Sequence, residues 1–446
     1  MMKYIKSKYS FFEELEHRYL HYSSASNEFL LLNSAKHALL TDLSPEELEK
    51  TDADFFNMLV KKRFLVPADA DETLQITQAR QRAMLNKDWY HVVVNTTLDC
   101  NLDCWYCYEN RVKGSKLTPQ VIAQICRNIE AHYALSPYTL LKVSFFGGEP
   151  FMNPKGMRAI IEFAREFCES REIELILDFT TNATLIDEEM VDYLSPFTCY
   201  FQITLDGAEG THNEIKKARN THLNTYRKTI EALRLIDSKI EHRLIAVRIN
   251  FDNKVLNEID SIIADISFLD REHCYVIVKK VWQVDRDGVN REPLLQVIQK
   301  LLDNDFLPDY YVMPKGGVCF AERENQVLFN YDGNVFKCTT ITSFDKENTL
   351  GDFDPESGLV TWKKDVMDEW LGDMQQPECL SCKWYGACYG PCNRQLMAHK
   401  GQFICTFDAM NLSQKEYLMY LFKYNILYNK IHHLPLFGHA QEEDRG

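Results

Sequence analysis

The chain has 446 residues, of which 45% are hydrophobic and 12% aromatic, and its formal net charge is −15. This length predicts about two or three domains with sizeable cores. The acidic charge argues against nucleic acid as the main partner, because phosphate backbones recruit basic surfaces. The sequence has no apolar run of membrane-spanning length and no signal-peptide core, so we expect a cytoplasmic protein without a membrane partner.

Residues 1–85 are predicted to form an amino-terminal domain and a linker. "YLHYSS" and "EFLLLN" are expected to be strands joined by a turn at "ASN". "SAKHALLTD" predicts a short helix with Ser34 as its N-cap, and "SPEELEKTDADFFNMLVKKRFLV" predicts helical turns that end in a strand. The stretch "PADADETLQITQARQRAMLNKD" is expected to begin as an acidic linker and to continue as helix.

Residues 86–282 alternate short apolar runs with amphipathic helix patterns. The runs are "HVVVNTT", "LKVSFF", "LILDFTTN", "YFQITLDG", "IAVRINFD" and "YVIVKKV". Buried strands that alternate with helices predict a parallel sheet with right-handed crossovers. The predicted fold class is therefore α/β, with a partial (β/α)6 barrel of the triosephosphate-isomerase type. Function collects at the carboxyl ends of the strands in such barrels.

Fourteen cysteines in a chain without an export signal are not expected to form a disulfide framework, because the cytosol keeps thiols reduced. Four of them lie singly in apolar stretches and are interpreted as small core residues: Cys126, Cys168, Cys199 and Cys274. The other ten lie in patterned groups: Cys100, Cys104, Cys107, Cys319, Cys338, Cys379, Cys382, Cys388, Cys392 and Cys405.

The loop after the first barrel strand reads "CNLDCWYC" and carries Cys100, Cys104 and Cys107. Three thiolates can hold three irons of a cubane cluster and leave the fourth iron without a protein ligand. Such an open site is where substrate or cofactor chemistry takes place. A zinc knuckle that takes a distant fourth ligand stays open as an alternative.

With Tyr106 before its last cysteine, this loop resembles the signature of radical S-adenosylmethionine (SAM) enzymes. The resemblance implies that the amine and carboxylate of SAM chelate the fourth iron. It also implies that an electron from the reduced cluster cleaves SAM to methionine and a 5′-deoxyadenosyl radical, which abstracts hydrogen.

Further segments resemble the parts of this family that contact SAM. "GGEP" resembles the strand end whose backbone and glutamate hold the amino group, and "TTN" and "ITLDG" resemble the segments that line the ribose and methionine. "VRIN" places a basic group near the carboxylate. The contacts that this resemblance implies are Tyr106, Gly147, Gly148, Glu149, Pro150, Asn182, Thr204, Asp206 and Arg248.

Residues 283–410 resemble the SPASM extension, an irregular iron–sulfur domain with two auxiliary four-iron clusters. The resemblance implies one cluster at Cys379, Cys382, Cys388 and Cys405, and a second at Cys319, Cys338 and Cys392, so that the chain holds three [4Fe-4S] clusters and SAM. A pair of zinc ribbons is the alternative. Residues 411–446 are predicted to be a helix, "LSQKEYLMYLFKYNILYNKIHHL", and a tail.

The second auxiliary set is one ligand short. Some relatives supply a further cysteine about six residues earlier, but that place falls near Met313 in "YYVMPKGGVC". Either another residue or water completes the site, or the open iron binds a substrate group such as a peptide thiolate, which metal coordination would deprotonate.

Two kinds of radical enzyme have this layout. Anaerobic sulfatase maturases carry an aspartate directly after the cysteine that follows the Gly-x4 segment, whereas here Thr339 follows Cys338. The amino-terminal block resembles the winged-helix-like recognition element of maturases of ribosomally made peptides, with "NEFLLLNSAKHALL" as its strand-to-helix segment. Such elements add a leader peptide as a strand to a sheet edge. A plain barrel-capping domain is the alternative.

The sequence thus predicts a radical SAM maturase that abstracts hydrogen from a core-peptide residue and forms a cross-link, with a thioether preferred. Carbon–carbon or carbon–oxygen cross-linking, including cyclophane formation, is one alternative. Formylglycine formation and a non-catalytic iron–sulfur or zinc protein are the others. The expected partners are a precursor peptide and a flavodoxin or ferredoxin. No catalytic base is assigned, because Tyr106, Asp206 and many further tyrosines are all candidates.

Overall fold

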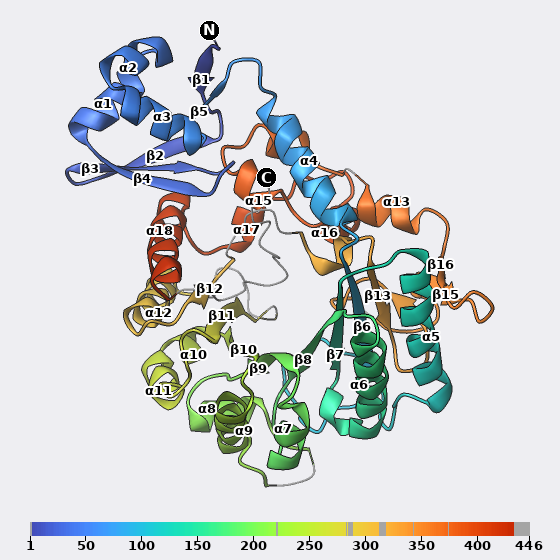
Figure 1. The fold of residues 1–446 in the computed structure, drawn as a ribbon. Coiled ribbons are helices and arrows are strands. Elements are labelled where there is room, and N and C mark those ends of the chain that lie inside the picture. The colour runs from blue at the N-terminus through green and yellow to red at the C-terminus, as the bar shows by residue number, and fades with distance from the viewer. Residues whose placement is uncertain are drawn as a thin grey trace.

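The computed structural model describes residues 2–219, 222–281, 283, 289–311, 318–341, 343–372 and 374–431. These residues form sheets of eleven, three and two strands, with helices packed around them (Figure 1). None of the helices in this part of the chain is both long and apolar enough to cross a membrane.

The centre of the large sheet consists of six parallel strands in chain order, which confirms the predicted α/β class. Each of the six pairs in parallel with the next. The strands are β6 (Trp89–Thr97), β7 (Leu140–Gly147), β8 (Glu174–Thr181), β9 (Thr198–Thr204), β10 (Arg243–Phe251) and β11 (Cys274–Lys280). The helices between them are α5 (Pro119–Leu135), η1 (Pro150–Met152), α6 (Pro154–Glu169), α7 (Glu188–Leu194), α8 (Glu209–Ile215), α9 (Thr225–Lys239), α10 (Asn253–Leu256) and α11 (Ile259–Asp265).

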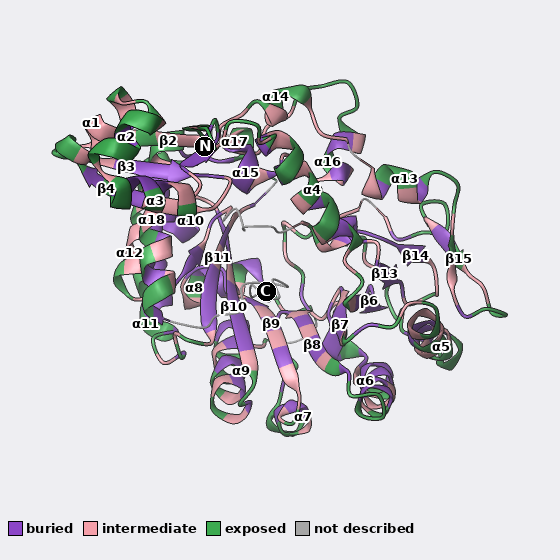
Figure 2. Cartoon of the chain, turned by 45° about the horizontal axis from the view of Figure 1, so that its top comes forward, coloured by how far each residue is buried: buried purple, intermediate pink, exposed green. Residues whose placement is uncertain are grey.

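The strands are buried on both faces, as expected for parallel strands flanked by helices. Val92 and Val94 of β6 belong to the main hydrophobic core, whereas His91 and Asn95 alternate with them on the other face. On α6, Ile160, Ala164 and other buried residues form one stripe toward the sheet, and Figure 2 shows the helices with exposed outer sides around buried strands.

The carboxyl-terminal region extends this sheet at both edges, which the sequence did not predict. Strand β12 (Pro308–Asp309) pairs in parallel with β11, and β13 (Gln326–Phe329) pairs in parallel with β6. Beyond β13 follow the antiparallel strands β14 (Val335–Phe336), β15 (Gly351–Phe353) and β16 (Val360–Trp362). The helical elements of this region are α12 (Arg291–Asp303), η3 (Phe320–Glu322), α13 (Val366–Leu371), α14 (Pro377–Leu380), α15 (Tyr385–Cys388), α16 (Asn393–Ala398), α17 (Thr406–Ala409) and α18 (Gln414–Ile431). Helix α18 is the predicted terminal helix, and its last predicted residues lie outside the described part.

The amino-terminal domain contains a three-stranded antiparallel sheet in the order β2-β3-β4. Its strands are β2 (Ser10–Leu15), β3 (Arg18–Ser23) and β4 (Glu28–Asn33), and β1 (Tyr4–Lys6) pairs with β5 (Leu65–Pro67). The helices are α1 (Ser34–Asp42), α2 (Pro45–Thr51), α3 (Ala53–Lys61) and α4 (Glu72–Leu85).

Two details of this domain differ from the prediction. The strands β3 and β4 are confirmed, but β1 and β2 were missed because charged residues interrupt their apolar pattern. The assignment of Ser34 as N-cap was wrong: Ser34 is the first helical residue, and the Asn33 side chain caps α1 by accepting a hydrogen bond from the Lys36 amide (2.9 Å).

This domain packs on the segment that carries Cys379, Cys382 and Cys388. The Tyr9 hydroxyl donates to the Leu380 carbonyl, and the Ser24 hydroxyl donates to the Lys383 carbonyl, both at 2.7 Å. The Phe11 ring lies 4.8 Å from the Trp384 ring. The contact is close enough that a Cβ on Gly386 would lie 2.6 Å from backbone atoms of Ala25.

Helix α4 links the amino-terminal domain to η3 and α16 of the carboxyl-terminal region through a buried ion pair. The Arg80 guanidinium donates to the Glu322 carboxylate at 2.7 Å and to the Asn393 side chain at 3.0 Å. Both charged side chains are at most 5% exposed. Removing one partner of such a pair leaves a charge buried without compensation.

We therefore expect Arg80→Ala to lower the free energy of unfolding by about 3–5 kcal/mol, since Glu322 loses its counter-charge. Urea unfolding of the full chain followed by circular dichroism measures the effect. Arg82→Ala, on the exposed side of the same helix, is the matched control and should change stability little. Equal effects of the two variants would contradict the assigned role of the ion pair.

Candidate active site

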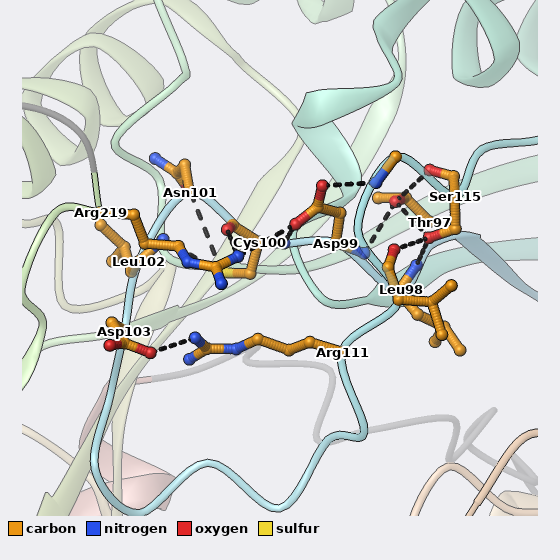
Figure 3. A network of polar contacts seen from close by, with 12 residues as sticks. Thr97, Leu98, Asp99, Cys100, Asn101, Leu102, Asp103, Arg111, Ser115 and Arg219 are labelled. Atoms are coloured by element: carbon orange, nitrogen blue, oxygen red, sulfur yellow. Dashed lines mark hydrogen bonds and ion pairs between the residues drawn. The ribbon is translucent and has the colours of Figure 1, made fainter.

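The loop that carries Cys100, Cys104 and Cys107 begins directly after β6, at the carboxyl end of the sheet. One side of it is held by the segment after α8. The Asp103 amide donates to the Lys217 carbonyl at 2.8 Å, and the Arg219 amide donates to the Asn101 carbonyl at 3.0 Å. The Arg219 side chain also pairs with Asp99 at 3.2 Å (Figure 3).

The other side of the loop is held by residues that follow the three cysteines in the chain. The Gly114 amide donates to the Asp99 carboxylate at 2.8 Å, and the Thr97 hydroxyl donates to the Ser115 carbonyl at 2.6 Å. Arg111 forms an ion pair with Asp103 (Figure 3). The backbone around the three cysteines is therefore fixed from both directions.

The three thiols of this loop interact electrostatically. Burial first, and then the Glu149 carboxylate, raise the pKa of Cys100 to about 12, and the Cys104 thiol adds to the shift. Burial also raises the pKa of Cys104, with a contribution from Cys107. The thiols of Cys100 and Cys104 are thus partly buried, whereas Cys107 is exposed.

Gly147 and Gly148 end β7 and pack against the backbone of the cysteine loop. A Cβ on Gly147 would lie 2.1 Å from the Thr97 carbonyl oxygen, and one on Gly148 would lie 2.2 Å from that of Asp99. Gly147 also has a φ of +110°, which favours glycine. The sequence interpretation attributed these glycines to an approach of SAM, but the side that a Cβ would occupy is filled by the chain itself.

Glu149 is fully buried and joins the ends of β7 and β8. It accepts hydrogen bonds from the Thr181 hydroxyl (2.7 Å), the Asn182 amide (2.8 Å) and the Phe151 amide (3.1 Å). Burial raises the pKa of this carboxyl. The next residue, Pro150, opens the short helix η1. Glu149 thus has a structural role that the sequence did not reveal.

Tyr106 and Asp206 meet in a buried polar network. The Tyr106 hydroxyl donates to the Asp206 carboxylate, which also accepts the Asn250 amide at 2.8 Å. The Lys216 ammonium lies 3.6 Å from Asp206 and is 5% exposed. Burial lowers the pKa of Lys216, but Tyr106, Cys104 and Asp206 outweigh burial and hold this pKa well above its usual value. These neighbours favour the charged form of Lys216, which lies beside Tyr106 and Asp206.

Three more predicted contacts lie at neighbouring strand ends. Thr204 and Arg248 are register partners on β9 and β10, and the Arg248 guanidinium donates to the Asn250 side chain at 2.9 Å. The Asn182 amide group lies 3.9 Å from the Cys100 sulfur. The tertiary structure therefore brings all nine predicted SAM contacts to the carboxyl end of the sheet.

Sequence reasoning missed Lys216 and Asn250. Asn250 is the last residue of "VRIN", but the sequence assigned it no role. Lys216 follows a short helix, where a single lysine looks like an ordinary solvated surface charge. The only available signal was its spacing of four residues from His212, since i and i+4 share one helix face. His212 is also buried and accepts the Asp206 amide at 3.2 Å.

The carboxyl-terminal cysteines influence one another's pKa values in two sets. Burial above all, with smaller contributions from the Cys388, Cys405 and Cys382 thiols, raises the pKa of Cys379 to about 11. In the second group, burial and then Glu322 raise the pKa of the Cys319 thiol, and Cys338 and Cys392 add to this. The position near Met313 lies outside the described residues.

The three thiols of the cysteine loop are the type of donor that a four-iron cluster binds. Within the described ranges, no three or more His, Cys, Asp or Glu side chains are spaced to share one metal ion. A four-iron cluster binds each thiolate to a different iron and does not require that spacing. The buried Lys216 ammonium beside the cysteine loop also suits a cofactor with a carboxylate group.

Comparison with known proteins identifies the central region. Residues 94–262, which run from β6 into α11, match the family model described as the Radical SAM superfamily. Residues 94–262 form a radical SAM domain. This confirms the resemblance and implies one [4Fe-4S] cluster and SAM as cofactors.

Several curated relatives are similar to this chain at low identity. A cysteine-type anaerobic sulfatase-maturating enzyme of Clostridium perfringens is 22% identical over 335 residues, which cover 66% of this chain and 86% of that enzyme. The radical SAM cyclopropyl synthase TigE of Paramaledivibacter caminithermalis is 21% identical over 321 residues, which cover 66% of this chain and 65% of TigE. The uncharacterized protein MJ0907 of Methanocaldococcus jannaschii is 22% identical over 257 residues, which cover 56% of this chain and 85% of that protein.

Among solved structures, native anSMEcpe with bound AdoMet superimposes with a TM-score of 0.58 at 18% identity. The match covers 76% of this chain and 99% of that one. It shows that the two proteins share a fold. The radical SAM domain of this chain thus has maturases among its relatives.

The close packing of β7 on the cysteine loop leads to a prediction. Gly148→Ala should displace the loop, because the new Cβ would collide with the Asp99 carbonyl. We expect about four fewer irons per chain after anaerobic reconstitution and loss of SAM cleavage, with the fold retained. Iron analysis and chromatography of 5′-deoxyadenosine measure both.

Gly210→Ala is the control for this substitution, because a Cβ there meets nothing within 4 Å. It should retain the full iron content. Full iron content in Gly148→Ala would show that the loop tolerates the collision.

Proposed function

We propose that this protein is a radical SAM peptide maturase that abstracts hydrogen from a core-peptide residue and forms a thioether. The observation that carries the proposal is the network beside the cysteine loop at the carboxyl end of the sheet. There the Tyr106 hydroxyl donates to Asp206, and the buried Lys216 ammonium lies 3.6 Å from the same carboxylate.

Each proposed cofactor can be assigned a set of residues that would bind it. Cys100, Cys104 and Cys107 would hold the radical SAM cluster, which together with SAM supplies a 5′-deoxyadenosyl radical as hydrogen acceptor. SAM would be contacted by the predicted residues at the strand ends, to which we add Lys216 as a partner of its carboxylate. The ammonium is held in place by Asp206 and kept charged by its neighbours. A flavodoxin or ferredoxin would supply electrons.

The two auxiliary clusters are part of the proposal. Cys379, Cys382, Cys388 and Cys405 supply the four thiolates that a closed cluster needs. Cys319, Cys338 and Cys392 supply three, and we propose that the remaining corner takes the thiolate of the peptide substrate. Thr339 after Cys338 lacks the carboxylate expected of a sulfatase maturase, which favours cross-linking over formylglycine formation.

The partner of the amino-terminal domain is proposed to be the leader of a precursor peptide. A three-stranded sheet followed by three helices supports the winged-helix-like interpretation. In the part of the chain that the structure describes, strand β4 pairs only with β3 and so offers an edge to an added strand. A bound leader would raise the effective concentration of the core peptide at the radical site. The proposed domains remain 1–85, 86–282, 283–410 and 411–446.

A peptide substrate is also supported by a solved structure. The anSMEcpe structure with bound AdoMet and Cp18Cys peptide has a TM-score of 0.57 to this chain. A second candidate function is carbon–carbon cross-linking, because the similar protein TigE is named a cyclopropyl synthase. The two functions differ in the fate of the cysteine thiol, which only a thioether consumes.

The central experiment is anaerobic. Purified protein should contain roughly eight to twelve irons per chain and should form 5′-deoxyadenosine from SAM when reduced. Incubation with the peptide encoded beside the gene should remove two hydrogens from that peptide and block alkylation of one cysteine. A product with every cysteine still alkylated would favour carbon–carbon bonding. Zinc in place of iron, or no 5′-deoxyadenosine, would disprove the enzyme assignment.

The leader-binding role of β4 is tested separately with Leu31→Glu. Leu31 is 39% exposed on this strand, and replacing an apolar contact with a charge should weaken leader binding by about tenfold or more. Fluorescence anisotropy of a labelled leader measures the affinity. Leu135→Glu, at the exposed end of α5, is the control and should bind normally. An unchanged affinity of Leu31→Glu would place the leader elsewhere.

A further inference from the structure

The surface around the cysteine loop is basic, although the chain as a whole carries a formal net charge of −15. Lys113 and Lys116, in the segment that follows the three cysteines, are exposed, and so is Lys217 after α8. Within the described residues, none of these three side chains forms an ion pair. Their positive charges therefore face solvent.

The carboxylates of the same surface are already paired. Asp103 forms an ion pair with Arg111, and Asp99 pairs with Arg219 at 3.2 Å (Figure 3). The remaining carboxyl of the loop, Glu109, has both oxygens shielded from solvent. The net charge that the loop presents to solvent is therefore positive.

Backbone contacts place the lysines on both sides of the loop. The Lys217 carbonyl accepts the Asp103 amide at 2.8 Å, so this lysine lies beside the cysteines although its segment is far away in the chain. Lys113 directly precedes Gly114, whose amide donates to Asp99 at 2.8 Å. Both flanks of the loop thus carry unpaired lysines.

The loop itself carries an exposed aromatic ring. Trp105 follows Cys104 in the chain and is 53% exposed, and the Cys107 thiol is exposed as well. The Trp105 ring lies 5.7 Å from the Tyr106 ring, which the hydrogen bond to Asp206 holds in place. An exposed tryptophan within a charged rim is a typical composition of a protein–protein contact. A protein bound there would lie next to the cluster ligands.

The basic surface ends on the side of β13 and β14. There Val112, Asp332, Asp345 and Lys346 help to line a cavity of about 500 Å³. Asp332 and Asp345 are exposed and accept hydrogen bonds from amides of their own turns. Because this side is acidic, an acidic partner would approach from the side of the lysines.

We propose that the surface formed by Trp105, Lys113, Lys116 and Lys217 is the docking site of a flavodoxin that reduces the cluster of the cysteine loop. The inference rests on the proposed function, which includes a reductant, and adds the surface that receives it. A flavodoxin is acidic and exposes the apolar edge of its flavin, which matches lysines around an indole. A ferredoxin is acidic too but exposes no ring to Trp105. One electron leaves the reduced flavin and enters the cluster, and no covalent bond forms or breaks in this step.

The test uses a triple variant of the full chain with Lys113→Glu, Lys116→Glu and Lys217→Glu. The rate of 5′-deoxyadenosine formation from SAM is measured without peptide against the concentration of reduced flavodoxin. At low salt the KM for flavodoxin should rise about tenfold or more, because the reversed charges repel an acidic protein. Added salt should narrow the difference from the unmodified protein. Iron content and the rate with photoreduced deazariboflavin, a small uncharged reductant that needs no docking site, should stay unchanged.

The matched control carries Lys50→Glu, Lys61→Glu and Lys364→Glu, which change the net charge equally at exposed lysines elsewhere. It should keep the KM for flavodoxin of the unmodified protein. Trp105→Ala should raise the KM for flavodoxin more than the KM for a ferredoxin, and a larger effect on ferredoxin would overturn the choice of partner.

The remaining outcomes separate this inference from the proposed function. An unchanged KM for flavodoxin in the lysine variant, or an equal rise in the control, overturns the docking site and leaves the enzyme assignment standing. Loss of iron in the lysine variant would assign these residues to loop structure and also overturn the inference. A raised KM for the precursor peptide alone would assign the surface to the substrate instead. If the unmodified protein forms no 5′-deoxyadenosine even with deazariboflavin, the proposed function itself fails.

Discussion

The contact on which the site depends is the backbone packing between the ends of β6 and β7. The carbonyl oxygens of Thr97 and Asp99 occupy the positions that side chains on Gly147 and Gly148 would need. Because backbone atoms cannot move aside as side chains can, this contact fixes the start of the cysteine loop relative to the sheet. The amides of Gly148 and Glu149 donate to these same two carbonyls at 2.9 Å, which adds directional restraint.

Buried charged side chains then connect this contact to the other strand ends of the site. Glu149 ties β7 to β8, and Asp206 ties β9 to Tyr106 and β10. In a low-dielectric setting each of these groups is costly unless its partners stay in place, so the network resists rearrangement. The positive charge of Lys216 is thereby held beside Cys104, in a position that a cofactor with an anionic group can use.

The amino-terminal domain is joined to the auxiliary region by contacts that pass close to both cysteine groups. Tyr9 and Ser24 bind the backbone between Cys379 and Cys388, and Arg80 binds Glu322, three residues after Cys319. Such shared contacts couple the stability of one region to that of the other. The amino-terminal domain therefore contacts the backbone that carries Cys379, Cys382 and Cys388.

The sequence alone predicted the six-stranded parallel sheet and the cysteine loop at its carboxyl edge, because strand periodicity and the spacing of Cys100, Cys104 and Cys107 are local patterns. It also predicted β3, β4 and the terminal helix. The tertiary structure decided the rest: β13 joined to β6, and the pairing of Lys216 with Asp206. These depend on contacts between residues far apart in the chain or on burial, and neither leaves a periodic signal in the sequence.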